Sequence, residues 1–440
     1  MKVGFISLGC SKNLIDTEMC ISLFRRNDFE IVNNPNDAEI LVVNTCGFIE
    51  PAKEEAINTL LEMAEFKKKG KCKYLIAMGC LVKRYKKDLE KSMPEVDLFI
   101  SIDEYGMIWD KICDLVGIEK KSNYCNLDYF DRTITTGDKS AYLKIAEGCD
   151  NNCTYCAIPM IRGRYISRKM EDIIKEAEGL VNNGVEEIIV IAQDTTKYGI
   201  DIYGEKKLPE LLKKLSNIDG VRWIRFLYAY PESITDELID VVKNNDKICK
   251  YFDIPIQHFS DNILKRMNRK SNGRQIDVLL NKIRKEIPNV VIRTSIIVGF
   301  PGETEQDFYS LYNFVNKAKF EKLGVFEYSK EEGTPASRIK EQVHYMTKKK
   351  RYNKLMKTQQ EIAMKCLKDK IGNKYEVLIE SISPNGKYYI GRSYMESPDT
   401  DGVIMIKKDK NIDLINKFVY VKIVGISGYD LIAELLDEHI

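Results

Sequence analysis

The first quarter of the chain alternates short apolar runs with stretches in which apolar residues recur every three or four positions. The helical spacing is clearest at Ile15, Met19 and Leu23, and Pro51 opens a second such stretch. The apolar runs lie at Val3–Leu8, Ile40–Val43, Tyr74–Met78 and Val96–Ile100. Strands that alternate with helices predict a parallel sheet covered by helices. We therefore expect a small doubly wound α/β domain over residues 1–116.

A second, larger part of the chain repeats this alternation after a break. Residues 117–138 lose the periodicity and gain charged and turn-forming residues, which predicts a linker. Residues 139–367 then carry six strand-like runs, at Tyr142–Ala146, Ile188–Ala192, Trp223–Tyr228, Phe252–Ile256, Val291–Val298 and Gly324–Tyr328. Six strands, each followed by a helix, predict a partial (β/α)6 barrel of the triosephosphate-isomerase kind, with its chemistry at the carboxyl ends of the strands.

The end of the chain, residues 368–440, has a third pattern of short strand-like runs between turn signals. They lie at Tyr375–Ile379, Tyr388–Arg392, Val403–Ile406, Phe418–Ile423 and Asp430–Leu435. Five such strands predict a small β-barrel of the oligonucleotide-binding type. The lysine-rich helix before it, near Thr347–Leu367, is expected to be a solvated connecting helix rather than a nucleic-acid contact.

Composition narrows the class of protein. The 440 residues are 44% hydrophobic and 30% charged with a net charge of +2, which is typical of a globular protein and argues against nonspecific polyanion binding. No apolar stretch approaches the roughly 20 residues of a membrane helix, and the N-terminus reads as a strand rather than a signal peptide. We expect a cytoplasmic protein without a membrane partner, whose 12 cysteines are reduced and available for metal ligation or redox chemistry.

Three cysteines follow the first strand of the predicted barrel in the segment EGCDNNCTYC. Cys149, Cys153 and Cys156 have the spacing C-x3-C-x2-C. Three thiolates on one loop can hold three corners of a [4Fe-4S] cluster and leave one iron open, and the segment lacks the second cysteine pair or the histidines of a structural zinc site. The alternative, three cysteines that fill a core, is disfavoured by the surrounding polar turn residues Asp150 to Asn152.

Three further cysteines each end a strand of the predicted N-terminal sheet. Cys10, Cys46 and Cys80 close the segments SLGC, VVNTC and IAMGC. The carboxyl ends of parallel strands share one edge, so we expect these cysteines to meet and to hold a second cluster with one open iron. The remaining cysteines show no shared geometry and are expected to be structural: Cys20, Cys72, Cys113, Cys125, Cys249 and Cys366.

The cysteine spacing within a six-strand partial barrel resembles the radical S-adenosylmethionine (SAM) superfamily. The resemblance implies that SAM binds at the open iron and is reduced to a deoxyadenosyl radical. The segment Thr294–Phe308, in which Gly299 and Gly302 permit close backbone approach, is similar to the superfamily's SAM-binding segment. The resemblance also implies SAM contacts for Gln193, which ends the second barrel strand, and for Glu303.

Two three-cysteine clusters, a sheet domain, a radical SAM barrel and a small β-barrel together resemble the methylthiotransferase family, in which the last part is a TRAM domain. Its members insert a methylthio group into a carbon–hydrogen bond. The resemblance implies two [4Fe-4S] clusters, SAM as both methyl donor and radical source, a sulfur source, and a low-potential electron donor such as flavodoxin or ferredoxin.

Short motifs indicate a branch of this family. The branch acting on adenosine in tRNA typically continues its first cysteine with Gln-Met-Asn, whereas this chain has Ser11-Lys12-Asn13 after Cys10. The runs Ile191–Gly204, Trp223–Pro231 and Asp253–Arg269 resemble the RimO branch, the ribosomal protein aspartate methylthiotransferases. That branch methylthiolates the β-carbon of an aspartate in small-subunit ribosomal protein twelve. Two alternatives stay open: a tRNA adenosine methylthiotransferase and a non-enzymatic, metal-stapled RNA-binding adaptor.

Charge and strand-end residues add three further expectations. Residues 371–440 contain 8 Lys+Arg and 11 Asp+Glu, a net of 8 − 11 = −3, which argues for a basic protein partner over tRNA. Arg225, on the third barrel strand, is expected to meet a substrate carboxylate in a bidentate contact. His258 also ends a strand and is expected to be a hydrogen-bonded structural group rather than a site residue.

Overall fold

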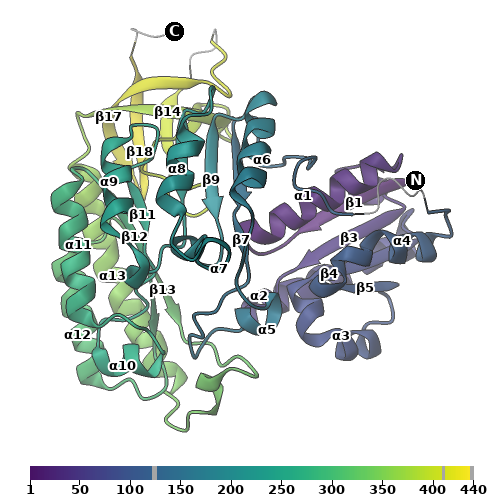
Figure 1. Ribbon diagram of the computed structural model, residues 1–440, viewed down its shortest axis with the longest axis horizontal. Helices are drawn as coiled ribbons and strands as arrows, with labels where there is room; N and C mark the ends of the chain where they lie inside the picture. Colours follow the sequence, from purple (N-terminus) through teal and green to yellow (C-terminus); the bar gives the residue numbers. More distant parts are fainter. Residues whose placement is uncertain (121–125, 409–411, 437–440) are drawn as a thin grey trace.

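Three units follow one another along the chain (Figure 1). The computed structural model describes residues 1–120, 126–408 and 412–436. Cys125, expected to be structural, lies outside the described residues. In the described ranges, no helix is both long and apolar enough to span a membrane.

The N-terminal unit is a five-stranded parallel sheet in the order β2-β1-β3-β4-β5, so the doubly wound prediction is confirmed. Its strands are β1 (Lys2–Ser7), β2 (Glu30–Ile31), β3 (Ile40–Thr45), β4 (Tyr74–Gly79) and β5 (Leu98–Ser101). The sequence pattern does not predict β2, because two residues are too few to show a period. The strand order reverses between β1 and β3, which is where folds of this type bind ligands.

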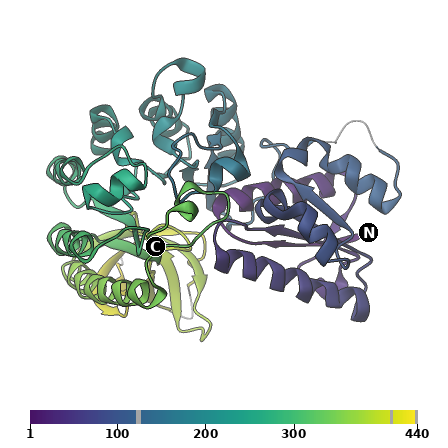
Figure 2. The same ribbon diagram turned by 90° about the horizontal axis from the view of Figure 1, so that it is seen from below.

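Helices cover both faces of this sheet (Figure 2). On one face, α1 (Ser11–Arg26) and α4 (Ile108–Val116) bury Phe24 and Trp109, whose rings meet edge to face at 5.5 Å. On the other face, α2 (Glu50–Lys69) and α3 (Cys80–Ser92) bury Leu60 and Val82. Apolar side chains therefore pack on both faces of the sheet, and the ends of its strands are the place for polar functional groups.

The described part of the segment predicted as a linker, residues 117–120 and 126–138, makes buried contacts with both neighbouring units. The Arg132 guanidinium is buried, forms an ion pair with Glu18 of α1, and donates from Nε to Glu176 Oε1 of α6 (Met170–Asn182) at 3.0 Å. One buried cation thus joins the N-terminal sheet domain to the core.

The central unit contains six parallel strands, as predicted. They are β6 (Ser140–Lys144), β9 (Glu187–Ile191), β10 (Trp223–Phe226), β11 (Tyr251–Asp253), β12 (Val291–Val298) and β13 (Lys322–Glu327). They form two three-stranded halves, β10-β9-β6 and β11-β12-β13, which meet at an isolated bridge between Ile224 and Ile248 and at a hydrogen bond from Ala229 N to the Asp253 carbonyl at 2.8 Å. The result is a partial barrel that is not continuously hydrogen-bonded.

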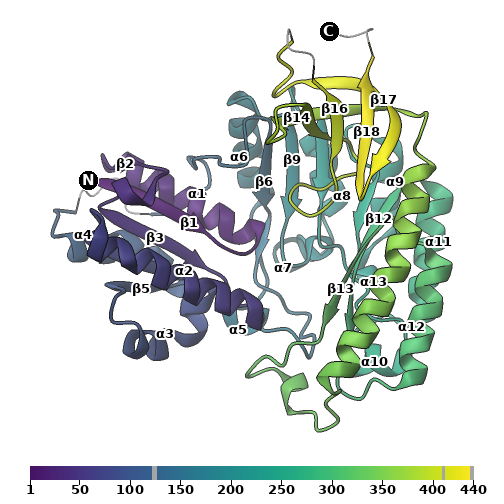
Figure 3. The ribbon, with the colours of Figure 1, turned by 180° about the vertical axis from the view of Figure 1, so that it is seen from behind.

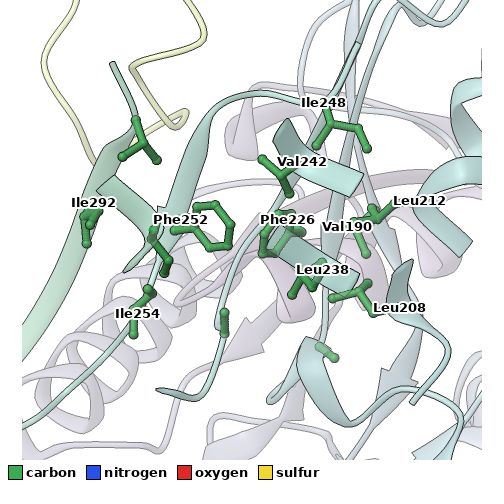
Figure 4. Close-up of a cluster of buried hydrophobic side chains, with 14 of the residues drawn as sticks. Val190, Leu208, Leu212, Phe226, Leu238, Val242, Ile248, Phe252, Ile254 and Ile292 are labelled. Carbon is green, nitrogen blue, oxygen red and sulfur yellow. The ribbon is translucent and has the colours of Figure 1, made fainter. Parts of the chain in front are cut away.

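Helices cover the outside of this barrel, and their apolar faces make the main core with the strands (Figure 4). Phe226 and Phe252, from adjacent strands, meet edge to face at 5.3 Å within it. Besides α6, the outer helices are α8 (Leu208–Ser216), α9 (Asp236–Asn244), α11 (Gly273–Glu286), α12 (Glu305–Ala318) and α13 (Tyr345–Lys368). Shorter elements are β7 (Ala146–Glu147), β8 (Ile166–Ser167), α5 (Ile158–Arg162), α7 (Ile200–Tyr203), α10 (Asp261–Arg266) and the 3-10 turns η1 (Pro35–Asp37), η2 (Ile102–Met107), η3 (Thr195–Lys197), η4 (Pro231–Ser233) and η5 (Pro335–Arg338).

The lysine-rich helix α13 is the sixth barrel helix, not a solvated connector. It runs alongside β13 and α12 (Figure 3) and buries Leu355, Ile362 and Ala363. Gln359 donates from Nε2 to the Phe320 carbonyl at 2.8 Å. The prediction was wrong because the lysines of α13 lie mainly on its outer face and hide a regular apolar stripe.

The C-terminal unit is a closed five-stranded barrel in the order β14-β15-β16-β18-β17, as predicted. Its strands are β14 (Lys374–Ile382), β15 (Tyr388–Arg392), β16 (Ile404–Lys407), β17 (Phe418–Ser427) and β18 (Asp430–Leu435). It caps the amino ends of the core strands (Figures 1 and 3). Trp223 at the start of β10 packs edge to face on Phe418 at 4.8 Å, and Tyr251 at the start of β11 donates to Asp401 at 2.8 Å.

The net charge of this small barrel does not describe its surface. Glu376 accepts from Arg222 Nε and from the Trp223 indole, each at 3.1 Å, and Glu396 is buried in its own loop, where it accepts from Ser393. These two acids are thus used in contacts within the protein. The exposed charged side chains include three acids, Asp399, Asp413 and Glu434, and five lysines, Lys374, Lys387, Lys407, Lys417 and Lys422. The net charge of the sequence is therefore not a measure of the charge on this surface, and the argument from it to a basic partner does not hold.

Candidate functional site

The three cysteines of the N-terminal unit lie at the carboxyl edge of its sheet. Cys10 caps the start of α1 after β1, Cys46 directly follows β3, and Cys80 opens α3 directly after β4. Because β1, β3 and β4 are neighbours in the sheet, the three cysteine turns lie side by side.

Glycines allow these turns to approach one another closely. Gly9 has φ +90°, and a Cβ at this position would lie 2.8 Å from the Cys46 Cβ and 3.0 Å from its Sγ. Gly79 has φ +102°, and a Cβ there would overlap the Asn44 side chain. Only glycine permits both the backbone conformation and the contact, so the turns before Cys10 and Cys80 are specified by the residues that precede the cysteines.

One asparagine side chain joins all three turns. Asn13 Nδ2 donates to the carbonyl oxygens of Leu8, after β1, and Thr45, at the end of β3, each at 3.1 Å. Its Oδ1 accepts from Cys80 Sγ at 3.3 Å. Sequence reasoning noted Asn13 only as part of a motif; its place three residues after Cys10 is the signal that points to this role.

The three cysteines of the central unit, Cys149, Cys153 and Cys156, form the core triad. They lie on the loop between β7 and α5, beyond the carboxyl end of β6. Cys149 N donates to the Gly163 carbonyl at 3.1 Å, and Cys156 N donates to the Cys153 carbonyl at 3.0 Å. Gly148 has φ +72°, and a Cβ there would overlap the carbonyl oxygen of Arg164. The loop is thus folded tightly against its own backbone.

A buried cation stands beside the middle cysteine. The Arg269 Nη1 lies 3.9 Å from Cys153 Sγ, and its guanidinium lies 4.3 Å from the ring centre of Tyr230. The Tyr230 hydroxyl lies 3.8 Å from the same sulfur. A guanidinium here compensates the negative charge that three thiolates bring to a cluster. Sequence reasoning did not single out Arg269.

Burial controls the protonation of these thiols. It raises the pKa of Cys80 to about 12 and that of Cys149 to about 11, and it also raises the pKa of Cys46 and Cys156. Such thiols hold their protons at neutral pH, and a bound metal centre removes them. These four thiols are therefore not reactive thiolates in the protein without metal.

The chemistry of the donor sets is compatible with iron-sulfur clusters. Across the described residues, no group of three or more His, Cys, Asp or Glu side chains is placed to hold a metal ion. Three thiolates without a fourth protein ligand would leave one iron of a [4Fe-4S] cluster open. That each triad holds such a cluster stays a prediction.

The two triads are neighbours, although 69 residues separate Cys80 from Cys149. Helix α5, which begins directly after the core triad, packs against the start of α3. Ala157 and Ile161 contact Cys80 in a small buried cluster. The chain that leaves Cys156 therefore packs on a cysteine of the other triad.

Charged groups reinforce this contact. Arg162 of α5 donates from Nη2 to Asn13 Oδ1 at 2.6 Å and to Asp16 Oδ2 at 2.8 Å, and from Nη1 to Glu147 Oε2 at 3.0 Å. Lys144 bonds Asp16 at 2.8 Å and Glu147 at 2.9 Å. Burial opposes ionisation of Glu147, but Lys144 and Arg162 lower its pKa to about 2. The network is ionised at neutral pH and fixes one triad against the other.

A second connection runs through the loop after β13. Glu331, buried on that loop, lies 2.8 Å from Arg84 Nη1, which also donates to the Gly47 carbonyl at 2.8 Å. On the same loop, Ala336 N donates to the Thr154 carbonyl at 2.9 Å. This loop thus contacts the residue after Cys153 directly and is linked to the residue after Cys46 through Arg84.

Gln193 lies just past the carboxyl end of β9. Its Nε2 donates to Glu147 Oε1 at 3.0 Å. Its Oε1 is buried and has no hydrogen-bond partner among the described residues. An unpaired buried acceptor is costly, and it suits a ligand with an amino group. A SAM contact by Gln193 stays a prediction.

The glycine-rich segment already makes hydrogen bonds and packing contacts within the protein. Glu303 accepts from the backbone N–H of Gly299 and of Phe300, and lies 3.3 Å from Arg351 Nη1 of α13. Gly299 has φ +72°, and a Cβ there would overlap Lys348. These contacts give Glu303 and Gly299 a structural task, and a SAM contact by either stays a prediction.

His258 and Arg225 have partners within the protein. His258 is buried, and its Nδ1 accepts from Ser260 N at 3.0 Å, but its Nε2 has no hydrogen-bond partner among the described residues, so a purely structural role stays a prediction. Arg225 is 0% exposed and donates to Glu187 Oε1 at 3.1 Å, and to carbonyls of the small barrel at Tyr394 (2.8 Å) and Ser393 (3.3 Å). The prediction that Arg225 meets a substrate carboxylate is wrong, because its donors close the amino end of the core.

The other described cysteines lie apart from both triads. Cys20, Cys72, Cys113 and Cys249 are buried, and Cys366 is half-buried on α13. Burial raises the pKa of Cys20 to about 12 and that of Cys249 to about 11. They lie within the apolar clusters of the sheet domain, the barrel and the helices, as expected for structural residues.

Three sequence families match successive parts of the chain. The radical SAM superfamily matches residues 143–315, the uncharacterized protein family UPF0004 matches residues 2–101, and the TRAM domain matches residues 371–436. The matches cover the core, the N-terminal sheet and the small barrel, respectively.

Whole-length relatives share one name. "Ribosomal protein uS12 methylthiotransferase RimO" of Alkaliphilus oremlandii is 62% identical over all of both chains, and that of Acetivibrio thermocellus is 49% identical over 99% of both. Among solved structures, the radical SAM methyltransferase TsrM of Kitasatospora setae, with cobalamin and a [4Fe-4S] cluster, matches with TM-score 0.56 and 11% identity over 76% of both chains. The cobalamin-dependent enzyme OxsB matches with TM-score 0.51 and 14% identity over 83% of this chain and 56% of that one. The structural matches show a shared fold.

Proposed function

This chain belongs to the RimO family of ribosomal protein uS12 methylthiotransferases, and from that membership we propose a division of labour between its two cysteine triads. The enzyme is a radical SAM methylthiotransferase that acts on uS12 and uses iron-sulfur clusters and SAM. Cys149, Cys153 and Cys156 hold the radical-generating cluster. Cys10, Cys46 and Cys80 hold the auxiliary cluster.

The observation that carries this proposal is the contact between the triads. Ala157, next to Cys156, packs on Cys80, and Arg162 binds Asn13, which itself receives the Cys80 Sγ–H. A reaction that brings two cofactors to one target carbon needs both to open toward one place. A direct packing contact between the two cysteine loops supports this arrangement, because it keeps the two sites close together.

When bound, SAM and the core cluster supply hydrogen-atom abstraction, and the auxiliary cluster supplies the sulfur. The residues of the chain hold these groups in position. Gln193 offers its free Oε1 to the amino group of SAM, and Arg269 compensates charge at Cys153. Asn13 and Arg162 fix the separation of the triads through a buried network that excludes water.

The finer features of the reaction follow the same proposal. The modified position is the β-carbon of an aspartate of uS12, and the reaction takes place in the cytoplasm. A low-potential donor such as flavodoxin or ferredoxin delivers electrons, and an external sulfur source renews the sulfur that is transferred.

Anaerobic iron and sulfide analysis of the reconstituted protein tests the proposal. The wild type should hold about eight irons, and each triple Cys→Ala variant about four. The variant of Cys149, Cys153 and Cys156 should lose SAM cleavage. The variant of Cys10, Cys46 and Cys80 should still cleave SAM but fail to methylthiolate uS12, measured by mass spectrometry.

Cys366→Ala is the matched control, because this half-buried thiol lies on α13 away from both triads. It should keep all irons and the activity. About four irons in the wild type, falling to none without the core triad, would remove the auxiliary cluster from the proposal.

Purified tRNA serves as the second substrate, and its modification in place of uS12 would overturn the assigned substrate.

A further inference from the structure

Lys12 differs from the other buried cations of the described chain. It is only 6% exposed, and its Nζ lies 3.2 Å above the ring centre of Tyr228. Among the described residues, no carboxylate lies at ion-pair distance from it and no acceptor takes its hydrogen bonds. By contrast, the other buried lysines and arginines there each have a carboxylate partner, as Arg162 has Asp16 and Arg225 has Glu187.

The tyrosine ring does not satisfy this ammonium. A cation–π contact is weaker than an ion pair, and an ammonium has three N–H donors that a ring face does not accept as an oxygen does. Asp253 lies within electrostatic range of Lys12 but is already engaged: its Oδ2 accepts from Tyr228 N at 3.0 Å, and its Oδ1 lies 3.4 Å from Arg293 Nη1. Lys12 therefore keeps donors for a group that comes from outside the chain.

The place of Lys12 is the junction of the two triads. It lies two residues after Cys10, on the first turn of α1. Tyr228 lies beyond the carboxyl end of β10, and its carbonyl accepts from Thr195 N at 3.2 Å. The preceding residue, Asp194, binds Asn151 of the core triad loop at 2.8 Å. The ammonium thus stands between a turn of one triad and the residues that support the other.

The backbone at this place is strained in a way that orients the ring. Tyr228 has φ +63°, in the left-handed region that bulky residues rarely adopt. Such conformations persist where surrounding contacts hold them, and they cluster at ligand sites. The hydrogen bonds from Thr195 and to Asp253 hold this one and place the ring beneath Lys12.

We propose that Lys12 binds the carboxylate of the substrate aspartate and thereby positions the carbon that is methylthiolated. This inference rests on the proposed function, which makes an aspartate β-carbon the target. That carbon is bonded directly to the carboxylate carbon, so a cation that holds the carboxylate also fixes the reacting C–H bond. A buried ion pair formed only with substrate discriminates strongly against a neutral analogue, because the unpaired ammonium stays costly without it.

A double-mutant cycle on binding tests this contact. The four combinations of wild-type or Lys12→Met enzyme with uS12 or its target Asp→Asn form are titrated, using cluster-loaded enzyme without reductant so that no turnover occurs. Lys12→Met should weaken binding of uS12 by about tenfold or more and leave binding of the Asn form within about twofold. Equal weakening of both forms, or of neither, would overturn the proposal.

Controls separate this contact from other causes. Lys12→Arg keeps the charge and should retain the preference for aspartate, whereas Lys374→Met removes an exposed lysine of the small barrel and should change neither affinity. Iron content checks that Lys12→Met is folded and loaded. SAM is titrated in parallel, because it also carries a carboxylate: weaker SAM binding with unchanged uS12 binding would assign the ammonium to SAM and refute the proposal.

The two proposals fail in different ways. Methylthio transfer by the wild type is measured separately with reductant and added sulfide, and its absence would overturn the proposed function. The binding cycle needs no turnover, so it decides the role of Lys12 in either case.

Discussion

The two ends of the core barrel treat buried charge differently. At the amino end, Arg225, Glu187 and Arg392 are buried and bonded to one another and to the small barrel. At the carboxyl end, Lys12 has no ion-pair partner among the described residues, and the Gln193 Oε1 accepts no hydrogen bond there. The first end is chemically closed, and the second has capacity left for ligands.

The comparison gives a criterion for telling a structural buried cation from one that is available to a ligand. Each end contains a buried cation that could pair with a substrate carboxylate, Arg225 at the amino end and Lys12 at the carboxyl end. The one with satisfied donors holds domains together, since removing its partners would leave uncompensated charge. The one without a partner is available for binding. Burial alone does not distinguish the two cations. What distinguishes them is whether each N–H donor has an acceptor within the protein.

The largest expected effect comes from a single methyl group at the carboxyl end. Gly148→Ala should remove the core cluster, because the added Cβ overlaps the Arg164 carbonyl and the residue has φ +72°. Iron analysis should show about four irons instead of about eight, with SAM cleavage lost. Gly184→Ala is the control: it has φ +97° with no atom near the new Cβ, and it should keep the irons. Full iron content in Gly148→Ala would contradict this account.

The next effect tests the closed end. Arg392→Met should lower the free energy of unfolding by about 3–5 kcal/mol, because Arg392 Nη2 lies 2.6 Å from both Glu187 Oε2 and Glu380 Oε1. Denaturant titration of the transition that separates the small barrel from the core measures it. Lys213→Met, which removes an exposed ion pair at 3.5 Å, should change stability by under about 0.5 kcal/mol. Equal effects would erase the contrast between buried and exposed pairs.

Acid should weaken the same end. Burial opposes ionisation of Glu187, but Arg392 and then Arg225 lower its pKa from 4.5 to about 2. A lowered pKa stabilises the fold above the unfolded value, so this contribution, about 3 kcal/mol, is present at neutral pH and is lost as the pH falls from 4.5 through 2. The free energy of unfolding, measured from pH 7 to pH 3, should therefore fall more steeply in the wild type than in Glu187→Gln. Parallel profiles would refute the assignment.

The smallest effect tests the bridge between the triads. Arg162→Gln should cost about 1–3 kcal/mol, less than Arg392→Met, because Lys144 still bonds Asp16 and Glu147. Arg164→Gln is the matched control, since that side chain is exposed and lies 3.8 Å from Asp150. Chemical unfolding of both variants measures the difference. If the two variants lose the same stability, the network does not hold the triads together.

Much of this architecture was predictable because its signals are local. Apolar period, turn residues and strand-end cysteines lie within a few positions of one another, so three units and two triads follow from the sequence. The strand β2 escaped prediction because two residues show no period, and α13 was misassigned because its lysines outnumber the residues of its apolar stripe. Both errors concern elements whose identity depends on what packs against them.

The site residues divide along the same line. The six cysteines were predicted from local signals: Cys149, Cys153 and Cys156 from their spacing on one loop, and Cys10, Cys46 and Cys80 from their places at strand ends. Arg225 was misjudged because its partners Ser393 and Tyr394 lie 168 and 169 residues away. Arg269 beside Cys153 was missed for the same reason, at a separation of 116 residues. Partners at such separations have no local signal in a single sequence.

Neighbours along the chain are enough to order the three units, to group the cysteines into two triads and to place the glycines beside them. Which buried charges are satisfied depends on the folded molecule. Glu376 bonds Arg222 of the core, Arg225 pairs with Glu187, and Lys12 packs on Tyr228 without an ion-pair partner in the described chain. This is because the electrostatic cost of a buried group depends on every atom around it, whichever part of the chain supplies that atom.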